Sequence, residues 1–329
     1  MQPLAGLLVV DFTRYLPGAY AARKLLRLGA RVVRVEAPDG DPMRRTAPGW
    51  DAVLRQGAES VVCDLKTDAA FARALCARAD VVLESFRPGV ASRLGIGAEH
   101  VPERTVYCSI TGFGTGSRHA LRAGHDLNYL GWAGALEDTA PALPPVQAAD
   151  LAGGALEAVT RILAALLERE RTGRGARIVV SMTHASHELV AHRLAGDPLP
   201  RLLTGGLACY RIYPTADGRF LTVAALEARF FARLCELLGC PELATDQYAP
   251  DRQEALADEL AARFAARPLA HWLSLFETED VCVGPVASLA EAAADLGTLA
   301  DLPDPVPLGA HTAAWRRELG HAAPDEARG

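Results

Sequence analysis

The first third of the chain alternates short apolar runs with helical patterns, and this alternation limits the fold more than any other feature. The runs cover residues 7–11, 31–36, 60–64, 81–84 and 106–110, with helical segments such as 19–28 between them. This alternation is typical of parallel strands covered by helices on both faces. The sequence therefore predicts an α/β fold with a Rossmann-like large domain built on a parallel sheet.

The remaining pattern predicts a second, smaller domain. Helical periodicity at 127–134 and 151–169 and a strand at 177–180 extend the large domain, and the periodicity breaks at 194–200, which we interpret as a linker. A hairpin at 209–213 and 220–224 and three helices near 228–238, 252–266 and 269–276 follow. We predict a large domain from 1–195 and about 286–329, whose tail packs back, and a small α+β domain at about 200–285.

Composition excludes several classes of protein. The net charge of −6 argues against general nucleic-acid binding. Seven scattered cysteines without a C-x-x-C pair fit neither a disulfide framework nor a zinc site. No window approaches the ~20 apolar residues of a membrane span, and the first residues lack the features of a secretory signal. We expect a soluble, cytoplasmic protein with no resident metal and no membrane association.

Common nucleotide and hydrolase motifs are missing. Only Gly18 lies between Asp11 and Leu25, so the first turn lacks the G-x-G-x-x-G of a dinucleotide site, and a nicotinamide dehydrogenase is not expected. G-K-[ST], G-x-S-x-G and H-E-x-x-H are also absent. We interpret His184 and His187 as a packed or solvated pair, not as metal ligands.

Two segments each place an ionisable side chain at a predicted helix start. His125 lies in Gly124-His125-Asp126, and Asp150 precedes the helix at 151–169. Unpaired N–H groups and the helix dipole favour a neutral histidine and an ionised aspartate there. The alternatives are an ordinary N-cap at Asp150 and a structural histidine at 125.

A pair of glycines, Gly153-Gly154, follows Asp150 in the first turn of that helix. Each glycine costs a helix about 1 kcal/mol relative to alanine. The pair therefore indicates that something approaches the backbone closely, either a substrate oxygen or another helix.

Motifs along nearly the whole chain resemble one family. They include Asp11-Phe12-Thr13-Arg14, Leu28-Gly29-Ala30, Asp64-Leu65-Lys66, Phe86-Arg87-Pro88-Gly89-Val90, Thr111-Gly112-Phe113-Gly114, Arg171-Thr172-Gly173-Arg174-Gly175 and Cys282-Val283-Gly284-Pro285-Val286. On these motifs the chain resembles the family III coenzyme A transferases. Gly124-His125-Asp126 with Asn128-Tyr129 resembles the α-methylacyl-CoA racemase branch.

The resemblance implies an epimerase of 2-methylacyl-CoA thioesters that proceeds through an enolate. It places His125 and Asp150 on opposite sides of the α-carbon, with Glu227 assisting, and the amides of Gly153 and Gly154 as candidate donors to the enolate oxygen. The implied coenzyme A contacts are Arg34, Arg44, Arg45, Lys66 and Arg87. It also implies an interlocked homodimer and no cofactor besides the coenzyme A of the substrate.

Two alternatives remain beside the epimerase. In the transferase branch, Asp150 is instead a nucleophile that forms an anhydride and then an aspartyl-CoA thioester. A non-catalytic protein that binds acyl-CoA or a partner is the third possibility. Two departures from the family pattern bear on the substrate. Ala58-Glu59 stands where cations are usual, which places a carboxylate near an expected phosphate, so another pantetheine thioester, such as that of a carrier protein, is an alternative to acyl-CoA. The segment from Ser181 to Gly205 is short, which indicates a small or polar acyl group or an altered dimer crossing.

Overall fold

The computed structural model describes residues 1–196, 199, 201–298 and 303–322. The chain divides into two compact units, of which unit 1 comprises residues 1–137, 142–191 and 301–329, and unit 2 comprises 138–141 and 192–300. Residues 286–300, which the sequence assigns to the large domain, belong to unit 2. Of the predicted linker at 194–200, residues 197, 198 and 200 lie outside the described residues.

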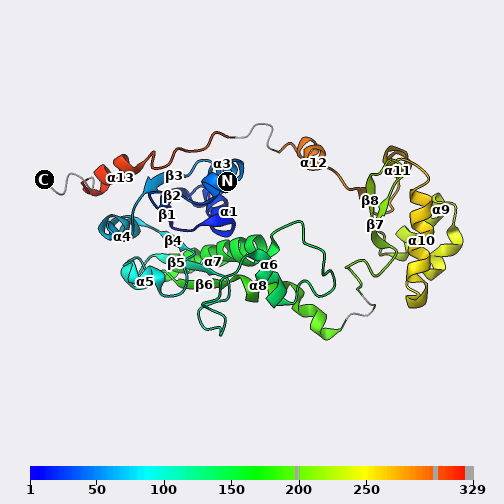
Figure 1. The fold of residues 1–329 in the computed structure, drawn as a ribbon, viewed down its shortest axis with the longest axis horizontal. Helices are drawn as coiled ribbons and strands as arrows, with labels where there is room; N and C mark the ends of the chain where they lie inside the picture. Colours follow the sequence, from blue (N-terminus) through cyan, green and yellow to red (C-terminus); the bar gives the residue numbers. More distant parts are fainter. Residues whose placement is uncertain (197–198, 200, 299–302, 323–329) are drawn as a thin grey trace. The chain divides into compact units, whose positions relative to one another are not determined.

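Unit 1 is built on a parallel sheet of six strands in the order β3-β2-β1-β4-β5-β6 (Figure 1). The strands are β1 (Leu8–Asp11), β2 (Arg31–Glu36), β3 (Glu59–Val62), β4 (Val81–Glu84), β5 (Val106–Thr111) and β6 (Arg177–Ser181). This topology confirms the predicted α/β fold. Its order reverses between β1 and β4, and ligands of such folds bind beyond the carboxyl ends of the strands at this point.

Helices cover both faces of the sheet because successive valines of the central strands point to opposite sides. Val9 and Val32 pack with α1 (Tyr15–Arg27) and α7 (Glu157–Thr172), whereas Val10 and Val33 pack with α4 (Ala69–Arg78) and α13 (Thr312–Leu319). The remaining helices of unit 1 are α2 (Met43–Thr46), α3 (Pro48–Arg55), α5 (Val90–Arg93), α6 (Asp126–Ala133) and α8 (Met182–Val190). Continuous apolar runs are the expected signature of strands buried on both faces.

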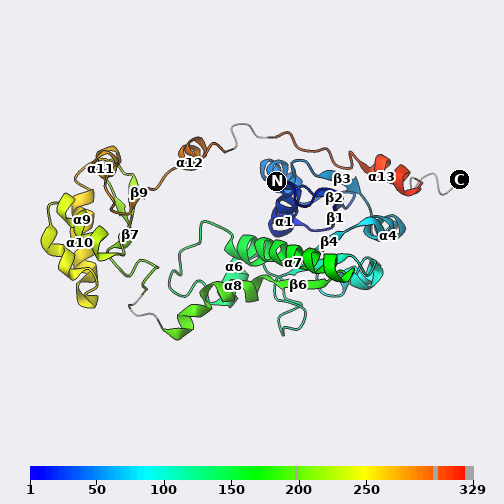
Figure 2. The ribbon, with the colours of Figure 1, turned by 180° about the vertical axis from the view of Figure 1, so that it is seen from behind.

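The C-terminal segment closes the free edge of β3 (Figure 2). The amide of Val62 donates to Thr312 Oγ1 at 2.9 Å, and the amide of Ser60 donates to His311 Nδ1 at 3.1 Å. Trp315 of α13 is 1% exposed and donates its indole N–H to Glu59. Covering an edge strand in this way removes a surface on which other chains could pair.

Unit 2 has its own core. An antiparallel sheet in the order β7-β8-β9 joins β7 (Tyr210–Pro214), β8 (Phe220–Ala224) and β9 (Val283–Pro285). Its helices are α9 (Ala228–Leu237), α10 (Gln253–Phe264), α11 (Leu269–Phe276) and α12 (Leu289–Asp295). Phe231, Phe264 and Trp272 form the centre of the core. Across both units, no helix in the described ranges is long and apolar enough to cross a membrane.

Candidate active site

Two cavities lie beyond the carboxyl ends of the strands of unit 1. The first is lined by residues that follow β1, β2 and β3, including Thr13, Asp41 and Lys66. The second, of about 370 Å³, is lined by residues that follow β4 and β5, and its volume falls within the ~300–1,000 Å³ of small-molecule sites. Both include Arg14, which follows β1, and Phe86, which follows β4. The two cavities therefore adjoin at the point where the strand order reverses.

His125 lines the second cavity and immediately precedes α6. The backbone of His125 is extended, and its amide donates a hydrogen bond to Asn128 Oδ1 at 3.1 Å. This bond fixes the start of α6. The side chain of His125 is exposed, and its ring lies edge-on to that of Tyr15, with centroids 6.0 Å apart. The predicted helix start is confirmed, and the imidazole is accessible from the cavity.

Asp150 lines the same cavity from a different element. It is the second residue of a π-helical segment, Ala149–Leu156, that leads into α7. Its amide donates to Asp126 Oδ1 at 2.9 Å. Segments of π-helix occur frequently at functional sites. The structure thus brings together the two side chains that the sequence selects.

Electrostatics at Asp150 differ from the sequence-based expectation of an ionised aspartate. Burial, together with the charge of Asp126, raises the pKa of Asp150 to about 7. Burial and the Asp150 charge also raise the pKa of the cavity-lining Tyr129 to about 12. Desolvation outweighs the helix N-terminus because the carboxyl is largely withdrawn from water. A carboxyl with this pKa exchanges protons readily near neutral pH.

Gly153 and Gly154 face a neighbouring helix, and neither lines the two cavities. A Cβ on Gly153 would lie 2.9 Å from the carbonyl oxygen of Met182, and one on Gly154 would lie 3.0 Å from the Met182 sulfur. Of the two explanations that the sequence allows for this pair, the structure supports close helix packing.

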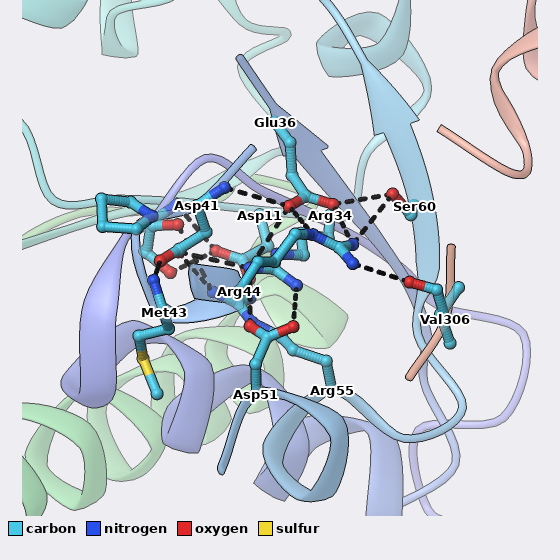
Figure 3. Close-up of polar contacts among 12 residues, drawn as sticks. Asp11, Arg34, Glu36, Asp41, Met43, Arg44, Asp51, Arg55, Ser60 and Val306 are labelled. Carbon is cyan, nitrogen blue, oxygen red and sulfur yellow. Dashed lines mark hydrogen bonds and ion pairs between the residues drawn. The ribbon is translucent and has the colours of Figure 1, made fainter. Parts of the chain in front are cut away.

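A buried ion cluster lies beside the first cavity and consists of Asp11, Arg34, Glu36, Asp41, Arg44, Asp51 and Arg55 (Figure 3). Arg34 is 2% exposed and makes two hydrogen bonds to Asp51, at 3.1 and 2.8 Å. Arg44 makes two hydrogen bonds of 2.7 Å to Glu36 and a third to the carbonyl of Val306. Neither arginine lines either of these two cavities. In contrast to the coenzyme A contacts expected of them, both guanidinium groups are bound to carboxylates within the protein.

The other coenzyme A candidates are distributed differently. Lys66 lines the first cavity and Arg87 the second. Arg45 is exposed and donates to the carbonyl of Asp39. Glu59, where the family usually has a cation, accepts hydrogen bonds from Arg31 and Trp315 and lines neither cavity, so its charge is compensated away from both of them.

Glu227 belongs to unit 2, where it is exposed and precedes α9. Sequence reasoning did not select Asp126, Tyr15 or Arg122, although Tyr15 and Arg122 line the second cavity and Asp126 holds Asp150. The position of Asp126 within the Gly124-His125-Asp126 motif was the available signal. In the described part of the chain, no three His, Cys, Asp or Glu side chains cluster closely enough to hold a metal ion.

The chain belongs to CoA-transferase family III, whose sequence model matches residues 4–318. Among its relatives is the alpha-methylacyl-CoA racemase of Homo sapiens, 35% identical over 309 positions that cover 88% of this chain and 78% of the racemase. The succinyl-CoA:glutarate CoA-transferase of Mus musculus is 32% identical, with 88% and 73% covered. A crystal structure of a CAIB/BAIF family protein from Brucella suis matches with a TM-score of 0.82 at 29% identity, covering 97% of this chain and 99% of that one. The family resemblance seen in the motifs is confirmed.

Proposed function

We propose that this protein is an epimerase of 2-methylacyl-CoA thioesters that works by proton transfer at the α-carbon. The observation that carries the proposal is that His125 and Asp150, 25 positions apart, line one cavity from different elements. An imidazole and a carboxyl group that line one cavity fit a reaction in which one of them removes a proton from the substrate and the other returns a proton to it. The 35% identity to the human racemase supports the same reaction.

The reaction would need no cofactor besides the coenzyme A of the substrate. One of the two groups takes the α-proton, the electron pair of the C–H bond moves onto the thioester oxygen, and the other group delivers a proton to the opposite face. In the reverse direction the roles exchange, for which a carboxyl with a pKa of about 7 is suited. Because α6 begins directly after His125, we assign its first amides, in place of Gly153 and Gly154, as donors to the enolate oxygen.

Coenzyme A would lie across the two adjoining cavities. Lys66 and Arg87 would attract its phosphates, and the shared residues Arg14 and Phe86 lie between the two cavities. We further propose a homodimer as the active form and Glu227 as an assisting carboxylate. Sedimentation of the purified protein tests for the homodimer. The role of Glu227 is tested by Glu227→Gln, which should lose at least tenfold in activity while the dimer is unchanged.

A coenzyme A transferase is the second candidate, favoured by the 32% identity to the succinyl-CoA:glutarate enzyme and by the position of Asp150 on the second cavity, where it would act as the nucleophile. Incubation with a 2-methylacyl-CoA in heavy water, followed by mass spectrometry, separates the two. Epimerisation predicts α-deuterium incorporation that disappears in His125→Ala and in Asp150→Ala and persists in His184→Ala, a histidine bound to Ser181. Acyl transfer to a second acid without deuterium incorporation would identify a transferase, and binding without either reaction a non-catalytic protein.

A further inference from the structure

Three arginines give the second cavity an excess of positive charge. Arg14, Arg87 and Arg122 line it, and Asp150 is the one carboxyl group on its described lining. Burial and a neighbouring carboxylate raise the pKa of Asp150 to about 7, so this carboxyl carries less than a full negative charge at neutral pH. In the described part of the chain none of the three arginines pairs with a carboxylate, whereas the arginines of the buried ion cluster all do.

Arg122 belongs to a different part of the cavity lining from the other two arginines. Arg14 lines both cavities, and Arg87 directly follows a residue that does. Arg122 comes from the segment 120–125, of which five residues line the second cavity and none lines the first. This segment ends at His125, three positions after Arg122. Arg14 and Arg87 are thus suited to the phosphates of a coenzyme A that crosses between the cavities, and Arg122 is left for the acyl group.

The guanidinium group of Arg122 contacts an aromatic ring. Its central carbon lies 5.6 Å from the centroid of the Trp132 ring, and that ring in turn lies against His119, with centroids 4.2 Å apart. A contact of this kind restricts where a guanidinium can lie. Within the described residues its N–H groups donate no hydrogen bond to the protein, so they are available to a ligand in the cavity.

An alkyl chain and a carboxylate would interact with Arg122 very differently. The end of a hydrocarbon chain would displace water from the guanidinium without replacing the lost hydrogen bonds, which costs free energy. A carboxylate would instead accept two parallel N–H donors from the planar guanidinium. Charge complementarity therefore favours an acyl group whose far end is an anion.

We propose that Arg122 determines substrate specificity by binding a carboxylate at the far end of the acyl group, so that the substrate is the monothioester of a short 2-methyl dicarboxylic acid. The chemistry at the α-carbon is unchanged by this contact. The inference rests on the proposed function, because it takes His125 and Asp150 to act on the α-carbon. A phosphate of coenzyme A is the other anion that could bind Arg122, and the test below separates the two.

The test compares 2-methylglutaryl-CoA, with its thioester at C1, and 2-methylpentanoyl-CoA, in which a methyl group replaces the carboxylate. α-Deuterium incorporation in heavy water is measured over a range of substrate concentrations. Arg122→Gln should raise KM for 2-methylglutaryl-CoA about tenfold or more, and change KM for 2-methylpentanoyl-CoA by less than about twofold. Arg118→Gln is the matched control and should change neither KM, because exposed Arg118 donates to His119 and lines neither cavity.

Equal losses on both substrates in Arg122→Gln would assign Arg122 to a phosphate of coenzyme A and overturn the proposal. Unchanged KM values for both substrates would overturn it as well. If the parent protein exchanges the α-proton of neither thioester, the proposed function fails, and calorimetric titration with the same two compounds then tests Arg122 separately. Binding of 2-methylglutaryl-CoA that weakens about tenfold in Arg122→Gln, with binding of 2-methylpentanoyl-CoA unchanged, would uphold the carboxylate contact.

Discussion

The imidazole of His125 meets the phenol ring of Tyr15 edge to face, with their planes at 90°. Tyr15 holds this place with a left-handed backbone, at φ 62°, a conformation that costs an L residue about 1–2 kcal/mol. Its amide donates to Asp41 Oδ2 at 3.3 Å, within the buried ion cluster. The cluster thus holds in place the residue against which the candidate catalytic ring rests.

Removal of the Tyr15 ring should therefore disorder His125. Edge-to-face aromatic pairs contribute about 0.5–1.5 kcal/mol, so we expect Tyr15→Ala to lower α-deuterium exchange up to about tenfold. Tyr15→Phe keeps the ring and should retain most of the rate. A loss in Tyr15→Phe equal to that in Tyr15→Ala would show that the hydroxyl, not the ring contact, is what matters.

Arg44 and Arg45 are adjacent but should differ sharply in their effect on stability. Arg44 is bound to Glu36 and to the carbonyl of Val306, and its loss leaves the buried Glu36 carboxylate with Arg34 and Ser60 as its side-chain partners. We expect Arg44→Ala to lower the free energy of unfolding by about 2 kcal/mol, because hydrogen bonds to a charged group are lost. Exposed Arg45 should change it by no more than about 0.5 kcal/mol on substitution by alanine. Urea denaturation measures both, and equal effects would refute the role given to the cluster.

Gly153→Ala should destabilise the protein, whereas Gly131→Ala should not. A Cβ at Gly153 would lie 2.8 Å from Ser186 Oγ and 2.9 Å from the backbone oxygen of Met182, which cannot move freely. We expect a loss of about 1–3 kcal/mol. Gly131, in α6, has no heavy atom within 4 Å of such a Cβ, so alanine should add about 0.5–1 kcal/mol there. Calorimetric Tm values of the two variants, compared with the parent protein, test the pair.

The half-buried Asp150 should also affect the pH dependence of stability. Its pKa is about 7 in the folded protein, against about 4 in an unfolded chain, so the folded state holds the proton more tightly. Its contribution to stability is complete below pH 4 and is lost as the pH rises to 7. We expect the free energy of unfolding of Asp150→Asn, relative to the parent, to rise by about 4 kcal/mol between pH 4 and 8, because each of the three pKa units corresponds to about 1.4 kcal/mol. A constant difference would mean that Asp150 titrates normally.

Local sequence pattern was sufficient to predict the sheet. Residues 31–36 form β2 as predicted, because Val32 and Val33 face opposite sides of a sheet that is covered twice. The helix beginning after His125 was also readable, since its signal lies within a few residues. Such features depend on interactions between near neighbours in the chain.

The roles of individual charged side chains could not be read in the same way. Arg34 matches a family motif, but its partner Asp51 follows in another element, and only the folded chain shows the pairing. The hydrogen bonding of the Glu59 carboxylate depends on Trp315, which lies 256 positions later in the chain. The glycines of the π-helical segment likewise pack against Met182, which lies in another helix. Sequence pattern selects such residues, whereas long-range packing decides what they contact.

The closure of β3 by the C-terminal segment has a consequence for biosynthesis. His311 and Ser60, which hydrogen-bond to each other, are 251 positions apart, so the ribosome makes nearly all of the intervening chain before this contact can form. The edge of β3 therefore stays uncovered in the nascent sheet while the second unit is translated and folds. Chaperone binding to this edge during translation would prevent aggregation, because exposed strand edges favour it.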